Sequence, residues 1–125
     1  MRSGLIALLG ILLLVACDPA RKDRMDEIRR TTGGDPHQGQ MKIRNYGCQS
    51  CHTIPGVQDA KALVGPPLDH WSKRVYIAGE VPNTTENLKK WLQHPTKIEP
   101  KTAMPEMGVT EQDSADIAAY LYSLD

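Results

Sequence analysis

The sequence predicts a small all-α domain. Three segments show the hydrophobic periodicity of amphipathic helices behind capping residues, and loops rich in Pro and Gly separate them. No segment alternates between apolar and polar residues as a half-buried strand would. The 125 residues suffice for one small domain, yet they include no Phe, two Trp and four Tyr. Because a core built from so few large side chains would be thin, we expect another group to fill the centre.

Charge and composition exclude two broad classes of protein. The 15 Lys and Arg residues are balanced by 15 Asp and Glu residues, so the basic excess of a nucleic-acid-binding protein is absent and no nucleic-acid partner is expected. Hydrophobic residues make up 40% of the chain and charged residues 24%, which is typical of a folded soluble domain and not of a disordered chain.

The N-terminal residues have the features of a secretory leader. Arg2 precedes an apolar run over residues 5–15, which is too short to span a bilayer as a mature helix. The run ends in Leu14-Val15-Ala16-Cys17, which resembles the bacterial lipobox, whose Cys is lipidated and becomes the mature N-terminus. We therefore expect a signal peptide over residues 1–16, with an uncleaved signal anchor as the alternative. Asp18 resembles the signal that retains lipoproteins at the inner membrane, which predicts an anchored protein on its periplasmic side.

Residues 17–34 are predicted to be a lipidated Cys followed by a flexible tether. The segment is dense in mixed charge up to Arg30 and continues in the polar run Thr31-Thr32-Gly33-Gly34. A short helix over residues 22–30 would have only two apolar residues to bury. We therefore expect the folded domain to comprise residues 35–125.

The first helix of that domain is predicted to follow Asp35. Asp35 is a favourable N-cap, and Pro36 is compatible with the first helical position. Gly39, Ile43 and Tyr46 then recur at i, i+4 and i+7 on one face.

Two further helices have similar signals. The second begins within residues 83–86 and ends before Pro95, where a helix cannot readily continue. Its inward-facing residues are Leu88, Trp91 and Leu92. The third begins at the capping sequence over residues 110–113. Its apolar face consists of Ile117, Tyr120, Leu121 and Leu124.

The sequence Cys48-Gln49-Ser50-Cys51-His52 has the spacing of c-type haem attachment. Each thiol can add to one haem vinyl group, and the adjacent imidazole can bind the iron. A zinc site would need a second Cys/His pair at ligand spacing, and a thioredoxin-like site would need a preceding strand. A disulfide between Cys48 and Cys51 would leave His52 unexplained. We predict one covalently bound haem c in each chain.

Four residues are candidates for the second axial ligand of the iron: His70, His94, Met104 and Met107. His94 ends a helix before a proline, where a cation is favoured at the surface. Met104 lies in an extended segment bounded by prolines, which can place a thioether across the haem face. We predict Met104, with the other three as alternatives.

These motifs resemble the class I cytochromes c over residues 37–125. Besides the haem motif, Gly65-Pro66-Pro67-Leu68 and the spacing from Pro95 to Met104 match the family. The resemblance implies a small class I cytochrome c fold, with helices around a haem whose iron is bound by His52 and Met104.

The resemblance also implies roles for residues around the haem. The Pro66 carbonyl would accept a hydrogen bond from His52, and Arg74 would lie near a haem propionate. Trp91 stands where many relatives have a Tyr that bonds the Met sulfur, and Tyr120 would pack across Gly39.

The run from Gly65 to Met104 is similar to cytochrome c domains associated with, or fused to, subunit II of bacterial haem–copper (caa3-type) oxidases. This similarity implies an electron-transfer protein and not an enzyme, because His/Met ligation leaves no open position on the iron. We expect a carrier that takes electrons from a quinol–cytochrome c reductase to a terminal cytochrome c oxidase. The alternatives are a haem c electron-accepting subunit of a periplasmic dehydrogenase, and a sensor that exchanges Met104 for a gas.

Overall fold

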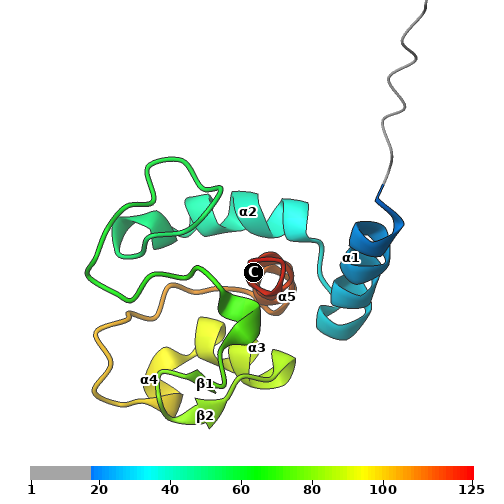
Figure 1. The fold of residues 1–125 in the computed structure, drawn as a ribbon. Helices are drawn as coiled ribbons and strands as arrows, with labels where there is room; N and C mark the ends of the chain where they lie inside the picture. Colours follow the sequence, from blue (N-terminus) through cyan, green and yellow to red (C-terminus); the bar gives the residue numbers. More distant parts are fainter. Residues whose placement is uncertain (1–17) are drawn as a thin grey trace, which may run out of the picture.

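Helix α5, Glu111–Tyr122, lies at the centre of the fold, with α2 and α3 on opposite sides of it and α1 at one end (Figure 1). The computed structural model describes residues 18–125, so the expected signal peptide and Cys17 lie outside the described residues. In chain order, the other helices are α1 (Pro19–Thr32), α2 (Pro36–Asn45), the 3-10 helices η1 (Cys48–Ser50) and η2 (Trp71–Lys73), α3 (Thr85–Gln93) and α4 (Pro95–Ile98). No helix within residues 18–125 is long and apolar enough to cross a membrane.

The three predicted helix starts are confirmed by their caps. The side chains of Asp35, Thr84 and Thr110 cap α2, α3 and α5, each by accepting a backbone N–H from the first turn. The shortest of these hydrogen bonds are 2.7, 3.2 and 3.1 Å long, respectively. Each cap satisfies a donor that has no partner within the helix, which fixes where the helix begins.

The described part of the chain contains one small sheet. Strands β1 (Tyr76–Ile77) and β2 (Val81–Pro82) pair antiparallel, with Ile77 opposite Val81. Two residues per strand contribute little to the fold, so the prediction of an all-α domain without a significant sheet is confirmed.

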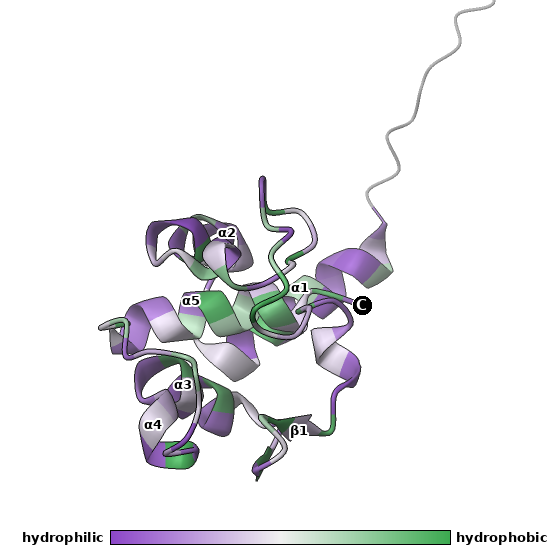
Figure 2. Ribbon diagram, turned by 90° about the vertical axis from the view of Figure 1, so that its left-hand side faces the viewer, coloured by the Kyte–Doolittle hydropathy of each residue, from purple (hydrophilic) through white to green (hydrophobic). Residues whose placement is uncertain are grey.

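The core forms where α2 crosses α5, and the hydrophobic residues of α5 gather at this centre (Figure 2). A Cβ added at Gly39 would lie 2.0 Å from the carbonyl oxygen of Asp116 and 2.9 Å from Cβ of Tyr120. Tyr120 therefore packs across Gly39, as the resemblance implies. Ile43 and Ile117 are each only 1% exposed at the same contact.

The segment expected to be a flexible tether is a helix over most of its length. α1 runs from Pro19 to Thr32; the Asp18 side chain caps it at 3.1 Å, and Gly33 ends it in the left-handed conformation, with φ 74°. The expectation gave weight to the low hydrophobicity of the segment, whereas its N-cap, its proline at the first position and its C-terminal glycine all favour a helix.

Candidate haem-binding site

The haem motif lies in a tight turn at the C-terminal end of α2. Gly47 adopts the left-handed conformation, with φ 77°, and lets the chain turn from α2 into η1. The backbone N–H groups of Cys51 and His52 both donate to the carbonyl of Cys48, at 3.2 and 3.0 Å. Because residues i and i+3 of a 3-10 turn lie on one side, the two cysteines face the same way. Both are free thiols, not joined as a disulfide.

Cys48 packs against the hydrophobic core and is only partly exposed. Burial raises the pKa of its thiol to about 11, with a smaller contribution from the neighbouring Cys51. The thiol is therefore protonated at neutral pH in the folded chain. This position suits a sulfur that is to join a hydrophobic macrocycle at the edge of the core.

The imidazole of His52 is held in one orientation and one tautomer. Its Nδ1 atom lies 2.7 Å from the carbonyl oxygen of Pro66. Since a carbonyl only accepts, Nδ1 carries the proton, and Nε2 keeps its lone pair for a metal. The hydrogen bond implied by the family resemblance is therefore present.

Gly65 lets the ring of His52 approach the backbone. A Cβ at Gly65 would lie 2.3 Å from Cε1 of the imidazole, too close for any other residue at that backbone position. The backbone N–H of Gly65 also donates to the carbonyl of Cys51 at 2.7 Å, and that of Leu68 donates to Thr53 at 2.8 Å. The Gly-Pro-Pro-Leu segment and the haem motif are thus tied together directly.

Trp71 provides a test of whether these residues fit a haem. The side chain is 5% exposed, and its buried indole N–H has no acceptor. A buried donor without a partner is costly, and native structures rarely keep one. A haem carries two propionate carboxylates, which are acceptors for such a donor. The unsatisfied indole therefore agrees with a site that is completed by haem.

Arg74 lies beside this indole, with its guanidinium carbon 5.0 Å from the ring centroid. The guanidinium donates to the carbonyls of Pro67 and Asp69, at 3.4 Å for the latter. The side-chain amide of Asn83 fixes the loop from the other side by donating to the carbonyls of Trp71 and Arg74, at 3.1 and 3.0 Å. Arg74 therefore supports the turn that holds His52; its expected place near a propionate stays a prediction.

The candidates for the second axial ligand fall into two groups. Met104 and Met107 are both partly buried and pack against the core. The side chains of His70 and His94 are 64% and 50% exposed, and Nδ1 of His94 lies 3.2 Å from the carboxylate of Glu106. Burial therefore favours a methionine but does not separate the two. Trp91 of α3 is 9% exposed and belongs to the same core.

Sequence reasoning missed Trp71 and Asn83 at this site. Trp71 is one of two tryptophans, and the sequence around it, between Leu68 and Arg74, predicts no helix or strand. A buried tryptophan usually needs an acceptor for its N–H, so its place in the loop was the available signal. No local pattern marks Asn83, whose side-chain amide donates to residues 9 and 12 positions earlier in the chain.

The fold and the site together define the class of protein. The domain is all-α and contains a CxxCH turn, and a Gly-Pro segment orients its histidine beside a thin core. These are the features of a c-type haem protein. The Cytochrome c family model matches residues 33–125, so the chain belongs to the cytochrome c family. It is therefore an electron-transfer protein with covalently bound haem c.

Three curated proteins similar to this chain are each named cytochrome c oxidase subunit 2. The one from Alkalihalophilus pseudofirmus is 30% identical over 78% of this chain and 28% of its own length. The one from Bacillus sp. (strain PS3) is 34% identical over 81% of this chain and 30% of its own length. The protein from Bacillus subtilis is 32% identical over 68% of this chain and 24% of its own length. The chain thus spans less than a third of each relative. The comparison with solved structures found no match.

Proposed function

We propose that this cytochrome c is a membrane-anchored one-electron carrier that delivers electrons to a terminal cytochrome c oxidase. In this proposal His52 and Met104 bind the haem iron, Cys48 and Cys51 hold the haem by thioethers, and Cys17 carries the lipid. The observation that carries the proposal is the similarity of the chain to three cytochrome c oxidase subunit 2 proteins, which extends over 68% to 81% of the chain. Those relatives are longer, so their association with an oxidase comes to this chain as an inference.

The chain's own residues supply binding, orientation and a low-dielectric environment. When bound, haem c supplies the one-electron chemistry of its iron. His52 presents Nε2, because Nδ1–H is held by the Pro66 carbonyl at 2.7 Å. Donation of Nδ1–H to a carbonyl raises the basicity of the imidazole and fixes its angle. Met104 adds a thioether, a neutral ligand that does not favour the ferric charge, so we expect a high reduction potential.

Replacement of each methionine tests the ligand assignment. In the oxidised protein, Met104→Ala should abolish the weak near-infrared band of the sulfur–iron bond and lower the reduction potential. Met107→Ala is the matched control, because its side chain is also partly buried against the core. It should leave both the band and the potential nearly unchanged. If the two variants exchange their behaviour, Met107 is the ligand; if the oxidised wild type lacks the band, the second ligand is not a methionine.

Covalent attachment and anchoring have separate tests. With Cys48→Ser and Cys51→Ser combined, haem should be lost in acid–acetone extraction, whereas the wild-type polypeptide should retain it. Mass spectrometry of the N-terminal peptide should find a diacylglyceryl group on Cys17, and Cys17→Ser should remove it. Several acyl chains bind a bilayer firmly, so the wild-type protein should need detergent to leave membranes. Unlipidated wild-type protein in membranes would contradict the anchor.

The electron acceptor is tested by stopped-flow spectroscopy. We expect the reduced lipoprotein to be reoxidised by a purified haem–copper oxidase in the same detergent, and affinity capture from solubilised membranes to recover oxidase subunits. Capture of a dehydrogenase, combined with slow reoxidation by the oxidase, would instead favour the role of an electron-accepting subunit.

A further inference from the structure

We propose that α1 is a rigid strut that restricts the orientation of the haem domain on the lipid surface. The inference rests on the proposed lipid anchor at Cys17. The cap of α1, Asp18, is the next residue in the chain, so no flexible segment separates the anchor from the helix. The orientation of the domain relative to α1 then depends on how firmly α1 is fixed to the rest of the fold.

The middle of α1 is fixed to the C-terminal end of α5. The guanidinium of Arg24 forms an ion pair with Asp125 and donates to the carbonyl of Tyr122 at 3.3 Å. One turn further along α1, Ile28 is buried, with 7% of its surface exposed. These contacts join residues about one hundred positions apart in the chain, so α1 is part of the domain.

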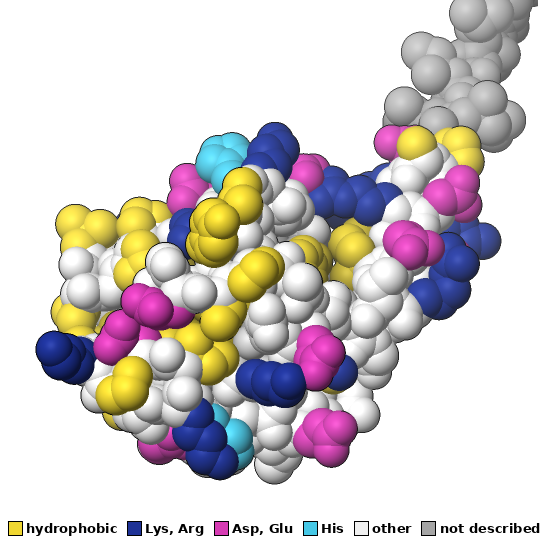
Figure 3. All heavy atoms as spheres, turned by 90° about the horizontal axis from the view of Figure 1, so that it is seen from below, with side chains coloured by type: hydrophobic (Ala, Val, Ile, Leu, Met, Phe, Trp, Pro, Cys, Tyr) yellow, Lys and Arg dark blue, Asp and Glu magenta, His cyan; other side chains and the backbone are white. Residues whose placement is uncertain are grey.

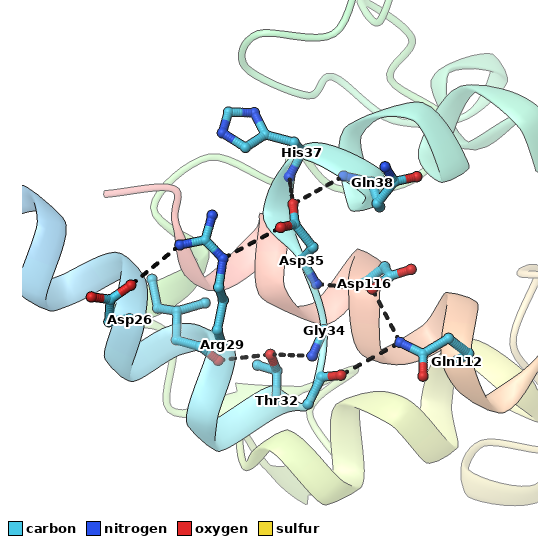
Figure 4. Close-up of polar contacts among 11 residues, drawn as sticks. Asp26, Arg29, Thr32, Gly34, Asp35, His37, Gln38, Gln112 and Asp116 are labelled. Atoms are coloured by element: carbon cyan, nitrogen blue, oxygen red, sulfur yellow. Dashed lines mark hydrogen bonds and ion pairs between the residues drawn. The ribbon is translucent and has the colours of Figure 1, made fainter.

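The end of α1 is fixed to the start of α2 by hydrogen bonds (Figure 4). The buried hydroxyl of Thr32 donates to the carbonyl of Ile28 at 2.7 Å and accepts the backbone N–H of Gly34 at 3.1 Å. Arg29 donates from Nε to the carboxylate of Asp35 at 3.3 Å. That carboxylate also caps α2, so the ion pair joins the two helices directly.

The same junction between α1 and α2 packs against α5. Asp35 donates its backbone N–H to the carboxylate of Asp116 at 2.8 Å, and Gln112 donates to the carbonyl of Gly33 at 3.4 Å (Figure 4). A Cβ at Gly34 would lie 2.2 Å from the carbonyl of Ala115, so the backbone lies directly on α5. A junction with polar contacts on both sides and no space for a methyl group cannot act as a hinge.

The exposed start of α1 sets the spacing between anchor and domain. Residues 18–23 are exposed, and the docked part begins at Arg24. The six residue steps from Asp18 to Arg24 span only about 9 Å at the helical rise. A flexible chain over residues 18–34 would have a root-mean-square length of about 21–25 Å and a reach of up to about 60 Å. Acidic and basic side chains are mixed along α1 (Figure 3), so helix geometry and not net charge would set the orientation.

The arrangement also places the haem-bearing segments relative to α1. In Figure 1, the loop that follows η1 and the segment over residues 99–110 lie on the side of α5 opposite α1. These two segments contain His52 and Met104. With α1 as the strut, α5 would separate these segments from α1 and leave them open to a protein partner.

Haem orientation in aligned membranes tests the strut. The oxidised lipoprotein is reconstituted into phosphatidylcholine vesicles, which are dried into oriented multilayers, and the haem EPR signals are recorded as the sample is tilted. Two variants carry about eleven extra residues. One has a Gly-Ser segment ending in Asp between Asp18 and Pro19, which keeps a cap for α1. The other has an (Glu-Ala-Ala-Ala-Lys)-type segment between Lys22 and Asp23, which lengthens α1 by about three whole turns.

We expect the signals of the wild type and of the helical insertion to change with tilt, and those of the Gly-Ser insertion to lose most of that dependence. Signals from the wild type that do not vary with tilt would overturn the proposal. Hydrogen exchange of the wild type in vesicles is the second measurement: α1 amides from residue 24 onward should be protected, and unprotected amides would overturn it as well. Loss of haem or of membrane binding in the wild type would instead refute the proposed function.

Discussion

The close approach of Gly39 on α2 to α5 leads to a quantitative prediction for Gly39→Ala. The added methyl group would lie 2.0 Å from the carbonyl oxygen of Asp116 and 2.9 Å from Cβ of Tyr120. Ordinary contacts begin near 3.4 Å, so α5 would have to move away from α2 by about 1.4 Å at this point. The atom that must yield first is helical backbone, which cannot rotate away as a flexible side chain can.

Two opposing contributions determine the expected change in the free energy of unfolding. Overpacking of a core typically costs about 1–3 kcal/mol, and the rigid backbone at this contact favours the upper end. Alanine is more favourable than glycine inside a helix by about 1 kcal/mol. The steric contribution is larger, and the net destabilisation should be about 2 kcal/mol. For a domain of this size, that corresponds to a melting temperature lower by roughly 8–16 °C.

Thermal unfolding of the haem-containing protein, followed by circular dichroism, measures the effect. Met41→Ala is the matched control, because Met41 lies on α2 with 50% of its surface exposed. It should change the stability by no more than about 0.5 kcal/mol. A Gly39→Ala protein as stable as the wild type, or more stable, would show that helix propensity outweighs the steric conflict and would refute the reasoning.

Three further predictions concern charge and hydrogen bonding. Lys42 at 2.8 Å and Tyr46 at 2.6 Å hold the pKa of Asp113 below its usual range. The stability gained is fully present above the unfolded pKa of about 3.9 and is lost as pH falls through the lowered pKa of the folded state. In urea titrations, Asp113→Asn should cost about 1 kcal/mol at about pH 7 and progressively less as pH falls below about 4. In the haem-free protein, burial raises the pKa of the Cys48 thiol to about 11. Iodoacetamide at about pH 8.5 should therefore alkylate this thiol roughly a hundredfold more slowly in the folded protein than in urea, and equal rates would contradict the burial. For the same reason, the free energy of unfolding should fall as pH rises above about 9. Trp71→Phe keeps an aromatic ring but removes the indole N–H that would donate to a haem propionate. A redox titration should therefore find a reduction potential lower by up to about 60 mV. An unchanged potential would mean that the indole does not contact a propionate.

The helices that cover the site were predictable from the sequence because their signals are local. Asp35, Thr84 and Thr110 each lie immediately before the helix that they cap, and the apolar periodicity begins within one turn. The haem motif was predictable for the same reason, because the required spacing lies within five residues, from Cys48 to His52.

Contacts between distant segments were predictable only where the resemblance supplied them. The hydrogen bond from His52 to Pro66 joins residues 14 positions apart, and no spacing rule gives it. Asn83 joins η2 to the C-terminal end of α5 by accepting from the hydroxyl of Tyr122, 39 residues later, at 2.9 Å. Such contacts depend on how the helices pack, which periodicity does not determine.

The helix over residues 19–32 shows why composition alone gave the wrong expectation for the tether. A segment with two apolar residues cannot form a core of its own, so its charge content suggests a solvated linker. Its stability comes from surface that the rest of the fold has already formed: Ile28 is buried where α1 meets α5 and α3, and Arg24 reaches the final residue of the chain. Burying one isoleucine is worth about 1.5–3 kcal/mol, while an ion pair exposed to solvent contributes much less. Ile28→Ala should therefore weaken the docking of α1 more than Arg24→Ala does, as measured by hydrogen exchange of the α1 amides, and this order distinguishes apolar docking from attachment by charge.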